Sequence, residues 1–178
     1  MEGETAPEND AVMEALALAP TDRVLEVGFG HGRTIEHVGA RVTGGIIAGI
    51  DQSPDMVALA SARCRRAIDG GRTRLLCGDS ATLPFPGGFF DKGYAVHTLY
   101  FWRPPLAHLR EIRRVLRDGG QFVLAYRAKD EAGTTNFPPD VYAFYSADEV
   151  EGLLIDSGFR GVDTSTTSRG MTLALARA

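Results

Sequence analysis

The chain has 178 residues, of which 44% are hydrophobic and 24% charged, with a formal net charge of −4 and two cysteines. These values are typical of one globular domain, and the acidic balance disfavours a nucleic-acid partner. Two cysteines are too few for a disulfide framework, and we find neither a signal peptide nor a run of about 18 apolar residues, so we expect a cytoplasmic protein without a membrane partner.

The first half of the chain alternates between amphipathic helices and apolar strands. Pro20 ends the first helical pattern, and Ser53 before Pro54 marks a later helix by an N-cap. The elements expected here are a helix over residues 9–18, a strand over 23–28, a helix over 34–38, a strand over 44–51 and a helix over 53–67.

The second half continues this alternation and ends in two strands. Lys92 and Gly93 are unusual inside a strand, so we expect the strand that contains them to begin late. Gly119 is expected to stop a helix in a left-handed cap, and Ser146 with Glu149 forms a capping box. The expected elements are strands over 72–79, 90–97 and 120–126, helices over 106–116 and 146–158, and final strands over 161–166 and 171–176.

Strands that alternate with helices at this spacing predict an α/β, Rossmann-like fold with a doubly wound, mostly parallel sheet and helices on both faces. The last two of the seven strands are joined by a short turn and predict an antiparallel hairpin at one edge. Within a single domain over 1–178 we expect an N-terminal helix or lid over 1–20, a cofactor-binding core over 21–128, a lid loop over 129–145, and a helix and hairpin over 146–178.

Three glycines, Gly28, Gly30 and Gly32, follow the first expected strand. Ligands of such sheets bind at the carboxyl ends of the strands, where glycine lets a ligand approach the backbone. A dinucleotide fingerprint needs glycine or alanine at position 33, and this chain has Arg33 there. The spacing alone leaves three interpretations open, namely a dinucleotide site, an adenosylmethionine site and a tight turn without a ligand.

The stretch LEVGFGHG resembles motif I, (D/E)-x-G-x-G-x-G, of the class I S-adenosylmethionine-dependent methyltransferases. Three further stretches resemble the family and follow its order, namely GIDQS, CGDSATLPF, and FDKGYAVHTLYFW through RVLRDGGQFVLAY. The resemblance is dense over residues 25–126 and is strongest to small stand-alone enzymes that methylate metabolites, a branch that includes quinone-biosynthesis C-methyltransferases. It implies S-adenosylmethionine as the cofactor.

The resemblance also implies roles for residues after the first three strands. Glu26 would favour the ammonium group of the cofactor, Asp51 would accept from the ribose hydroxyls, and Asp79 from the adenine amino group. Asp51 has an alternative interpretation, as a turn residue before a helix. Met56 could pack on the adenine, and its alternative interpretation is an ordinary core methionine. The implied cofactor residues are Glu26, Gly28, Gly30, Gly32, Asp51, Gln52, Met56, Asp79 and Ser80.

The methyl acceptor is expected at the end of the fourth strand. His97 is the candidate general base there, with the alternative of a hydrogen-bonded histidine at a strand end, and Tyr100 is the second catalytic candidate. Aromatic residues on this loop and on the lid loop favour an apolar or aromatic acceptor. They are Phe101, Trp102, Tyr142 and Tyr145. We recognise no metal-ligating set and expect no metal.

The sequence therefore predicts an enzyme, an S-adenosylmethionine-dependent methyltransferase that acts on a small organic acceptor and releases S-adenosylhomocysteine. One alternative is an NAD(P)-dependent reductase, which would need a Tyr-x-x-x-Lys pair that the chain lacks. Another is a non-catalytic binding module that keeps the cofactor site, because methyl transfer has no obligatory catalytic side chain. We expect a small-molecule partner and a monomer or homodimer.

Overall fold

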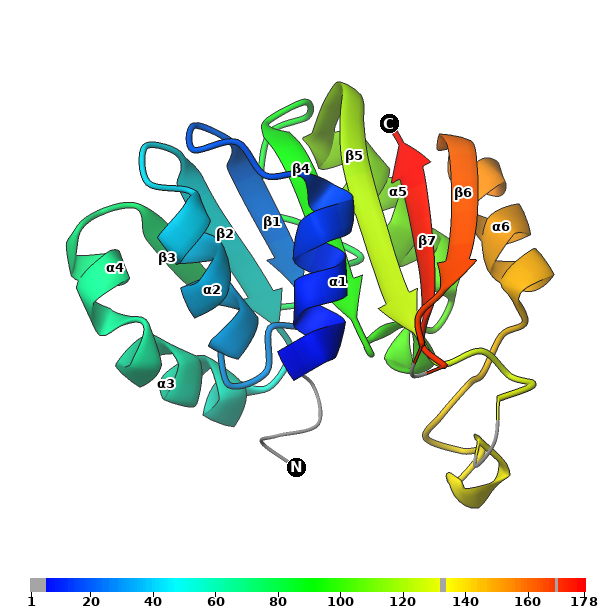
Figure 1. Cartoon of the computed structure of the whole chain (residues 1–178). Coiled ribbons are helices and arrows are strands. Elements are labelled where there is room, and N and C mark those ends of the chain that lie inside the picture. Colours follow the sequence, from blue (N-terminus) through cyan, green and yellow to red (C-terminus); the bar gives the residue numbers. More distant parts are fainter. Residues whose placement is uncertain (1–5, 132–133, 169) are drawn as a thin grey trace.

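The computed structural model describes residues 6–131, 134–168 and 170–178. Its centre is a seven-stranded sheet of order β3-β2-β1-β4-β5-β7-β6, with helices on both faces (Figure 1). Strand β7 is antiparallel to β5 and β6, whereas the pairs among β1 to β5 are parallel. The expected Rossmann-like fold is confirmed, and so is the antiparallel hairpin at one edge.

Most elements lie where the sequence places them. The capping box of Ser146 and Glu149 is present, and the Ser53 hydroxyl accepts from the Met56 N–H at 3.4 Å. The helices are α1 (Ala6–Leu16), α2 (Arg33–Arg41), α3 (Pro54–Arg63), α4 (Arg65–Asp69), α5 (Pro105–Val115) and α6 (Ala147–Asp156), with 3-10 turns η1 (Leu99–Phe101) and η2 (Thr134–Asn136). The strands are β1 (Arg23–Val27), β2 (Ile46–Asp51), β3 (Thr73–Cys77), β4 (Phe90–Val96), β5 (Leu116–Tyr126), β6 (Arg160–Thr166) and β7 (Thr172–Arg177).

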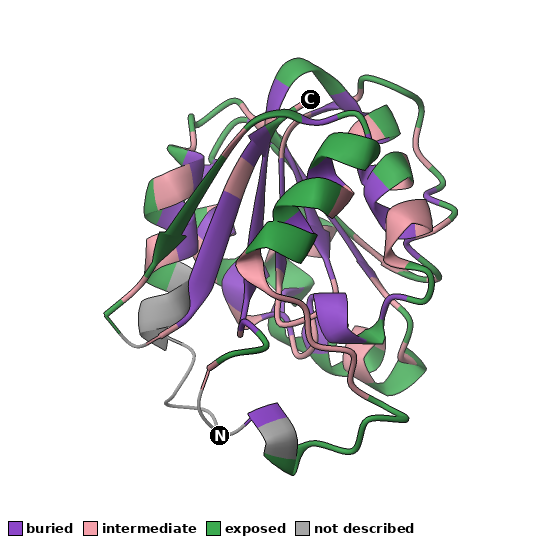
Figure 2. Ribbon diagram, turned by 90° about the vertical axis from the view of Figure 1, so that its right-hand side faces the viewer, coloured by how far each residue is buried: buried purple, intermediate pink, exposed green. Residues whose placement is uncertain are grey.

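The two faces of the sheet bury two apolar clusters. On one face, α1 packs against β4 and β5 through the fully buried Val12 and Leu16. On the other face, α5 and α6 bury Ile112 and Leu154. Viewed from the β6 edge, buried strands lie between helices whose outer surfaces are exposed, and β6 itself is largely exposed (Figure 2). The described part of the N-terminal region is therefore a helix that packs on the sheet.

Strand β4 begins at Phe90, so the expected late start is wrong. Phe90 is fully buried and pairs with Leu116, and the register shifts before Lys92. Lys92 and Gly93 are themselves regularly paired with both neighbouring strands, β1 and β5, so neither residue interrupts β4. Gly93 fits because a Cβ there would lie only 3.3 Å from the ring of Phe122.

Two helix ends also differ from expectation. Helix α5 ends at Val115, before the glycines, because Leu116 is extended, buried and already paired with Phe90. Gly119, with φ +75°, therefore belongs to the irregularly paired stretch of β5 between Leu116 and Gln121 instead of a helix cap. The single helix expected over 53–67 is divided at Cys64 into α3 and α4.

Candidate functional site

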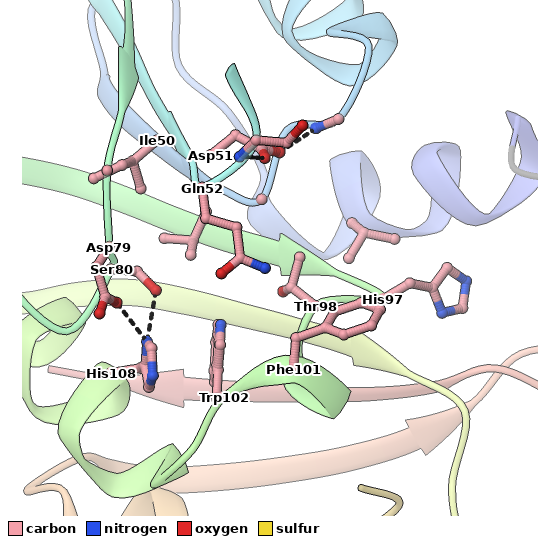
Figure 3. Close-up of a pocket in the computed structure, with 16 residues that line it drawn as sticks. Ile50, Asp51, Gln52, Asp79, Ser80, His97, Thr98, Phe101, Trp102 and His108 are labelled. Atoms are coloured by element: carbon pink, nitrogen blue, oxygen red, sulfur yellow. Dashed lines mark hydrogen bonds and ion pairs between the residues drawn. The ribbon is translucent and has the colours of Figure 1, made fainter. Parts of the chain in front are cut away.

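A pocket of about 260 Å³ opens at the carboxyl ends of β1, β2, β3 and β4 (Figure 3). Parallel strands bring their carboxyl ends to one edge, which is why residues far apart in the sequence meet here. The pocket is lined by Val27, Gly28, Gly30, Ile50, Asp51, Gln52, Ser53, Gly78, Asp79, Ser80, Val96, His97, Thr98, Phe101, Trp102 and His108.

The glycine loop after β1 has left-handed backbone at all three glycines, with φ between +51° and +81°. A Cβ at Gly30 would meet nothing within 4 Å, so the loop leaves open space on its pocket side. A Cβ at Gly28 would lie 1.9 Å from Thr98 Cγ2. Gly32 does not line the pocket, and a Cβ there would lie 2.8 Å from Ala60 Cβ of α3. Gly28 and Gly30 shape the pocket, whereas Gly32 permits close packing.

Asp51 joins the glycine loop to the start of α3. Its Oδ2 accepts from the Gly30 N–H at 2.8 Å and its Oδ1 from the Ser53 N–H at 2.9 Å. The carboxylate therefore has the turn role considered above and also lines the pocket, where each oxygen retains a second lone pair. Gln52 lines the pocket beside it, whereas Met56 does not.

At the β3 end of the pocket, Asp79 and Ser80 meet a residue that sequence reasoning missed. His108 of α5 is 8% exposed, and its Nδ1 lies 2.8 Å from Ser80 Oγ and 3.5 Å from Asp79 Oδ1. Burial lowers the pKa of His108, and nearby Asp79 partly offsets this. The available signal was a histidine four residues before Ile112 on the apolar stripe of α5, a position that normally holds an apolar side chain.

Glu26 lies beneath the glycine loop and does not line the pocket. It is 2% exposed, and its Oε2 accepts from the Tyr94 hydroxyl at 2.6 Å. Burial raises the pKa of Glu26 to about 8, although the Tyr94 hydrogen bond acts in the opposite direction. The structure therefore places this carboxyl next to Tyr94 and not at the pocket surface.

His97 and Tyr100 lie together after β4. His97 has a left-handed backbone, with φ +55°, and its Nδ1 is 3.0 Å from the Tyr100 hydroxyl oxygen. That oxygen also accepts from the Arg127 N–H at 2.6 Å. His97 lines the pocket, and its ring points away from Asp51 and Asp79 (Figure 3). Tyr100 is 5% exposed and does not line the pocket, so it contacts the site through His97.

An aromatic cluster adjoins this end of the pocket. Phe101 and Trp102 line the pocket, with Phe101 39% exposed and Trp102 4% exposed. The ring of Tyr142, from the expected lid loop, lies 5.0 Å from that of Phe101 and 6.1 Å from that of Tyr100. Tyr142 and Tyr145 do not line the pocket. Tyr142 of this loop therefore packs behind Phe101, and the described part of the loop projects beyond the end of β5 (Figure 1).

The pocket is ordered along its length. Asp79, Ser80 and His108 lie at one end, His97 at the other, and Asp51 with Gln52 between them (Figure 3). Two carboxylates line it, and neither Lys nor Arg is among its lining residues. This set disfavours a pyrophosphate and fits a cationic nucleoside with ribose hydroxyls and an amino-bearing base, which is the chemistry of S-adenosylmethionine. The described residues contain no group of three or more His, Cys, Asp or Glu side chains that could hold a metal ion.

Comparison with known proteins identifies the class. Residues 25–124 match the family model described as "Methyltransferase domain". An uncharacterized methyltransferase of Bacillus subtilis (strain 168), YdaC, is 28% identical over 130 residues, which cover 73% of this chain and 70% of that protein. The chloroplastic 2-methyl-6-phytyl-1,4-hydroquinone methyltransferase 2 of Oryza sativa subsp. japonica is 36% identical over 110 residues, 58% of this chain but only 30% of that enzyme.

The solved structures agree. A SAM-dependent methyltransferase from Aquifex aeolicus superposes with a TM-score of 0.82 at 23% identity, covering 95% of this chain and 88% of that one. The chain thus belongs to the class I S-adenosylmethionine-dependent methyltransferases, and its cofactor is S-adenosylmethionine. The methyltransferase interpretation of the glycine loop is confirmed over the NAD(P)-dependent one. In the part of the chain that the structure describes, no helix is both long and apolar enough to cross a membrane.

Proposed function

We propose that this chain transfers the methyl group of S-adenosylmethionine to a small apolar or aromatic acceptor. The observation that carries the proposal is one pocket in which Asp51 and Asp79 lie on one side and the partly exposed ring of Phe101 on the other. The hydroquinone methyltransferase named above is consistent with an acceptor of this kind. We further propose a cytoplasmic monomer or homodimer without a nucleic-acid partner, in keeping with the net charge of −4.

The cofactor-binding residues are proposed from the β1, β2 and β3 ends of the pocket. S-adenosylmethionine, when bound, supplies a methyl group already activated on a sulfonium. Asp51 accepts from the ribose hydroxyls with its remaining lone pairs, and Asp79 with Ser80 holds the adenine. Gln52 and Met56 complete that end, Met56 from just outside the lining. Glu26 contributes as a buried carboxyl beneath the loop, without direct contact.

The acceptor-binding residues are proposed from the β4 end. Phe101 presents apolar surface to the acceptor and excludes water from it, and Trp102, which lies between Phe101 and His108, continues this apolar wall toward the adenine (Figure 3). The loop over 129–145 acts as a lid through Tyr142 and Tyr145, which support this wall from behind. His97 accepts the proton that the acceptor releases, and the Tyr100 hydroxyl holds the imidazole by the 3.0 Å contact with Nδ1.

The test is calorimetric titration of the purified chain with S-adenosylhomocysteine, NADH and NADPH. We expect S-adenosylhomocysteine to bind and the nicotinamide cofactors not to bind. Asp51→Ala should weaken that binding at least about 100-fold, because it removes charge-assisted hydrogen bonds and the tether of the glycine loop. Asp55→Ala, on the exposed face of α3, is the matched control and should bind like the wild type.

Activity is tested separately, by following methyl transfer to a panel of phenols, hydroquinones and apolar amines. Turnover with at least one apolar acceptor supports the proposal. Tight binding of S-adenosylhomocysteine without turnover on any of them would favour a non-catalytic binding module. Binding that is unchanged in Asp51→Ala would remove Asp51 from the site.

A further inference from the structure

His108 is held in the pocket wall by two independent contacts. Its Nδ1 meets Ser80 Oγ at 2.8 Å, and its ring stacks on that of Trp102 with centroids 5.4 Å apart and an interplanar angle of 9°. Both His108 and Trp102 line the pocket. The imidazole therefore has a fixed position beside the residues proposed to hold the adenine.

Two other residues of α5 hold the segment that follows β3 and contains Ser80, at positions further along that segment. Glu111 Oε2 accepts from the Leu83 N–H at 2.9 Å, and Arg114 donates to the Leu83 and Phe85 carbonyls at 3.0 and 2.9 Å. Arg114 also holds Glu111 by a hydrogen bond of 2.8 Å. Glu111 and Arg114 hold residues 83–85, which do not line the pocket. His108 is the one of these three α5 residues that lines the pocket, beside Asp79 and Ser80 (Figure 3).

The Asp79 carboxylate is oriented from one side. Its Oδ1 accepts from the Ala81 N–H at 2.8 Å and faces His108 Nδ1 at 3.5 Å. Among the described residues Oδ2 has no hydrogen-bond partner, and the side chain is 65% exposed. With Oδ1 held in this way, Oδ2 is the oxygen available to a ligand.

We propose that His108 is a positioning residue that makes the site selective for a 6-aminopurine over a 6-oxopurine, by holding Asp79 and Ser80 in place. The proposal rests on the proposed function, in which Asp79 holds the adenine. A fixed carboxylate oxygen accepts a hydrogen bond from an exocyclic amino group but repels a carbonyl oxygen at the same place. A carboxylate free to turn away loses this discrimination, because it can avoid the repulsion.

The test compares binding of S-adenosylhomocysteine with binding of S-inosylhomocysteine, in which an oxo group replaces the 6-amino group. The measured quantity is the ratio of the two Kd values by calorimetry. We expect the wild type to favour the adenosyl compound at least about tenfold. His108→Phe keeps a ring to stack on Trp102 but loses Nδ1, and should lower the ratio by about tenfold, the value of one hydrogen bond. His108→Asn places an amide near the Nδ1 position and should restore most of the ratio.

Ser80→Ala is a second variant in case His108→Phe does not fold, since it removes the other partner of the 2.8 Å bond. It should lower the ratio similarly, and combining it with His108→Phe should add little. A purely structural role would lower the affinity for both compounds and leave the ratio unchanged, which would overturn the proposal. Equal binding of both compounds by the wild type would also overturn it, while the methyltransferase function would stand. No binding of S-adenosylhomocysteine would instead reject the proposed cofactor site.

Discussion

The two ends of the pocket are built in different ways. At the proposed cofactor end, carboxylates and hydroxyls are fixed by hydrogen bonds of 2.8 to 2.9 Å, as at Asp51 and between Ser80 and His108. At the proposed acceptor end, the ring centroid of Tyr142 lies 5.0 Å from that of Phe101 and 6.1 Å from that of Phe144. Polar groups at set distances select one ligand, whereas packed rings select for size and apolar character.

This difference indicates which end of the pocket tolerates substitution of its side chains. The proposed cofactor contacts Asp51 and Asp79 lie at the end of β2 and just after β3, where the hydrogen-bonded sheet limits backbone movement. The acceptor end rests on a 3-10 turn and a loop, and repacking of aromatic rings costs less than loss of a buried hydrogen bond. The predictions below therefore probe polar groups at one end and packing at the other.

The largest effect is expected at Glu26, beneath the cofactor end. The folded state holds a proton on this carboxyl up to about pH 8, whereas the unfolded chain releases it near the ordinary pKa of 4.5. Since the folded state binds more protons in this window, the free energy of unfolding should fall as pH rises from about 4.5 to about 8 and then level off. Each pKa unit corresponds to about 1.4 kcal/mol, so the fall is on the order of 5 kcal/mol.

Urea unfolding at several pH values checks this, with Glu26→Gln as the variant. The amide oxygen introduced by this substitution can still accept from the Tyr94 hydroxyl, but an amide does not titrate. Glu26→Gln should therefore lack the fall and exceed the wild type in stability above pH 8. Glu151→Gln, at an exposed position of α6, should keep the wild-type profile. Parallel profiles for the wild type and Glu26→Gln would show that Glu26 is not the source of the pH dependence.

Gly28→Ala should be the next most severe change. The new Cβ would overlap Thr98 Cγ2 at 1.9 Å, and the backbone has φ +75°, so strain and overpacking add. We expect a loss of about 3 kcal/mol in the free energy of unfolding and of binding to S-adenosylhomocysteine. Gly152→Ala is the matched control, because a Cβ there meets nothing within 4 Å on the surface of α6. Equal melting temperatures for the two variants would contradict the strain argument.

At the acceptor end, His97→Ala should lower kcat about 100-fold and leave the Kd for S-adenosylhomocysteine nearly unchanged. The reason is that His97 lies at the opposite end of the pocket from Asp79 (Figure 3). Tyr100→Phe removes the hydroxyl that holds Nδ1 and should lower kcat by a smaller factor. Full activity in His97→Ala would make this histidine structural and leave positioning of the acceptor as the main source of rate.

The sequence predicts the residues of the pocket that belong to local motifs, but not the contacts between distant segments. The glycine loop, Asp51 and Asp79 are local signals, because strand, glycine and acid follow one another within a few residues. The parallel sheet then brings them to one edge, and the alternation of elements is sufficient to predict that sheet. The resemblance to the methyltransferases therefore selects Gly28, Gly30, Asp51 and Asp79 from the sequence alone, and the structure brings these residues together in one pocket.

Contacts between distant segments are not accessible in the same way. The bond between Ser80 and His108 joins positions 28 residues apart, and no local pattern encodes it. The early end of α5 follows from pairing of Leu116 with Phe90, which overrides the helix-stopping glycines beyond it. Burial of Glu26 against Tyr94 depends on the parallel register of β1 and β4, which the sequence does not specify.

Phe101→Ala should raise the KM for an apolar acceptor about tenfold with little change in Kd for S-adenosylhomocysteine. Its ring is 39% exposed, so truncation removes apolar contact without opening the core. Phe137→Ala is the matched control, since that ring is 37% exposed in the same cluster but does not line the pocket. A rise in the Kd of S-adenosylhomocysteine in Phe101→Ala as large as the rise in KM would mean that this ring serves the cofactor, and the contrast between the two ends would fail.

The smallest effect concerns Thr98, which lies where the two ends meet. Its hydroxyl oxygen is buried and has no hydrogen-bond partner among the described residues, although the residue lines the pocket. Thr98→Val keeps the methyl group packed on Gly28 and removes the unpaired oxygen, so the melting temperature should rise by about 2–4 °C, equivalent to about 1 kcal/mol. Thr98→Ser keeps the hydroxyl, loses the methyl contact and should melt below the wild type.

Because an unpaired buried hydroxyl is costly, its retention beside the pocket is explained if a bound ligand pairs with it. A more stable Thr98→Val that binds S-adenosylhomocysteine more weakly would assign this hydroxyl to the polar, cofactor-selecting end, whereas unchanged affinity would assign Thr98 to packing alone.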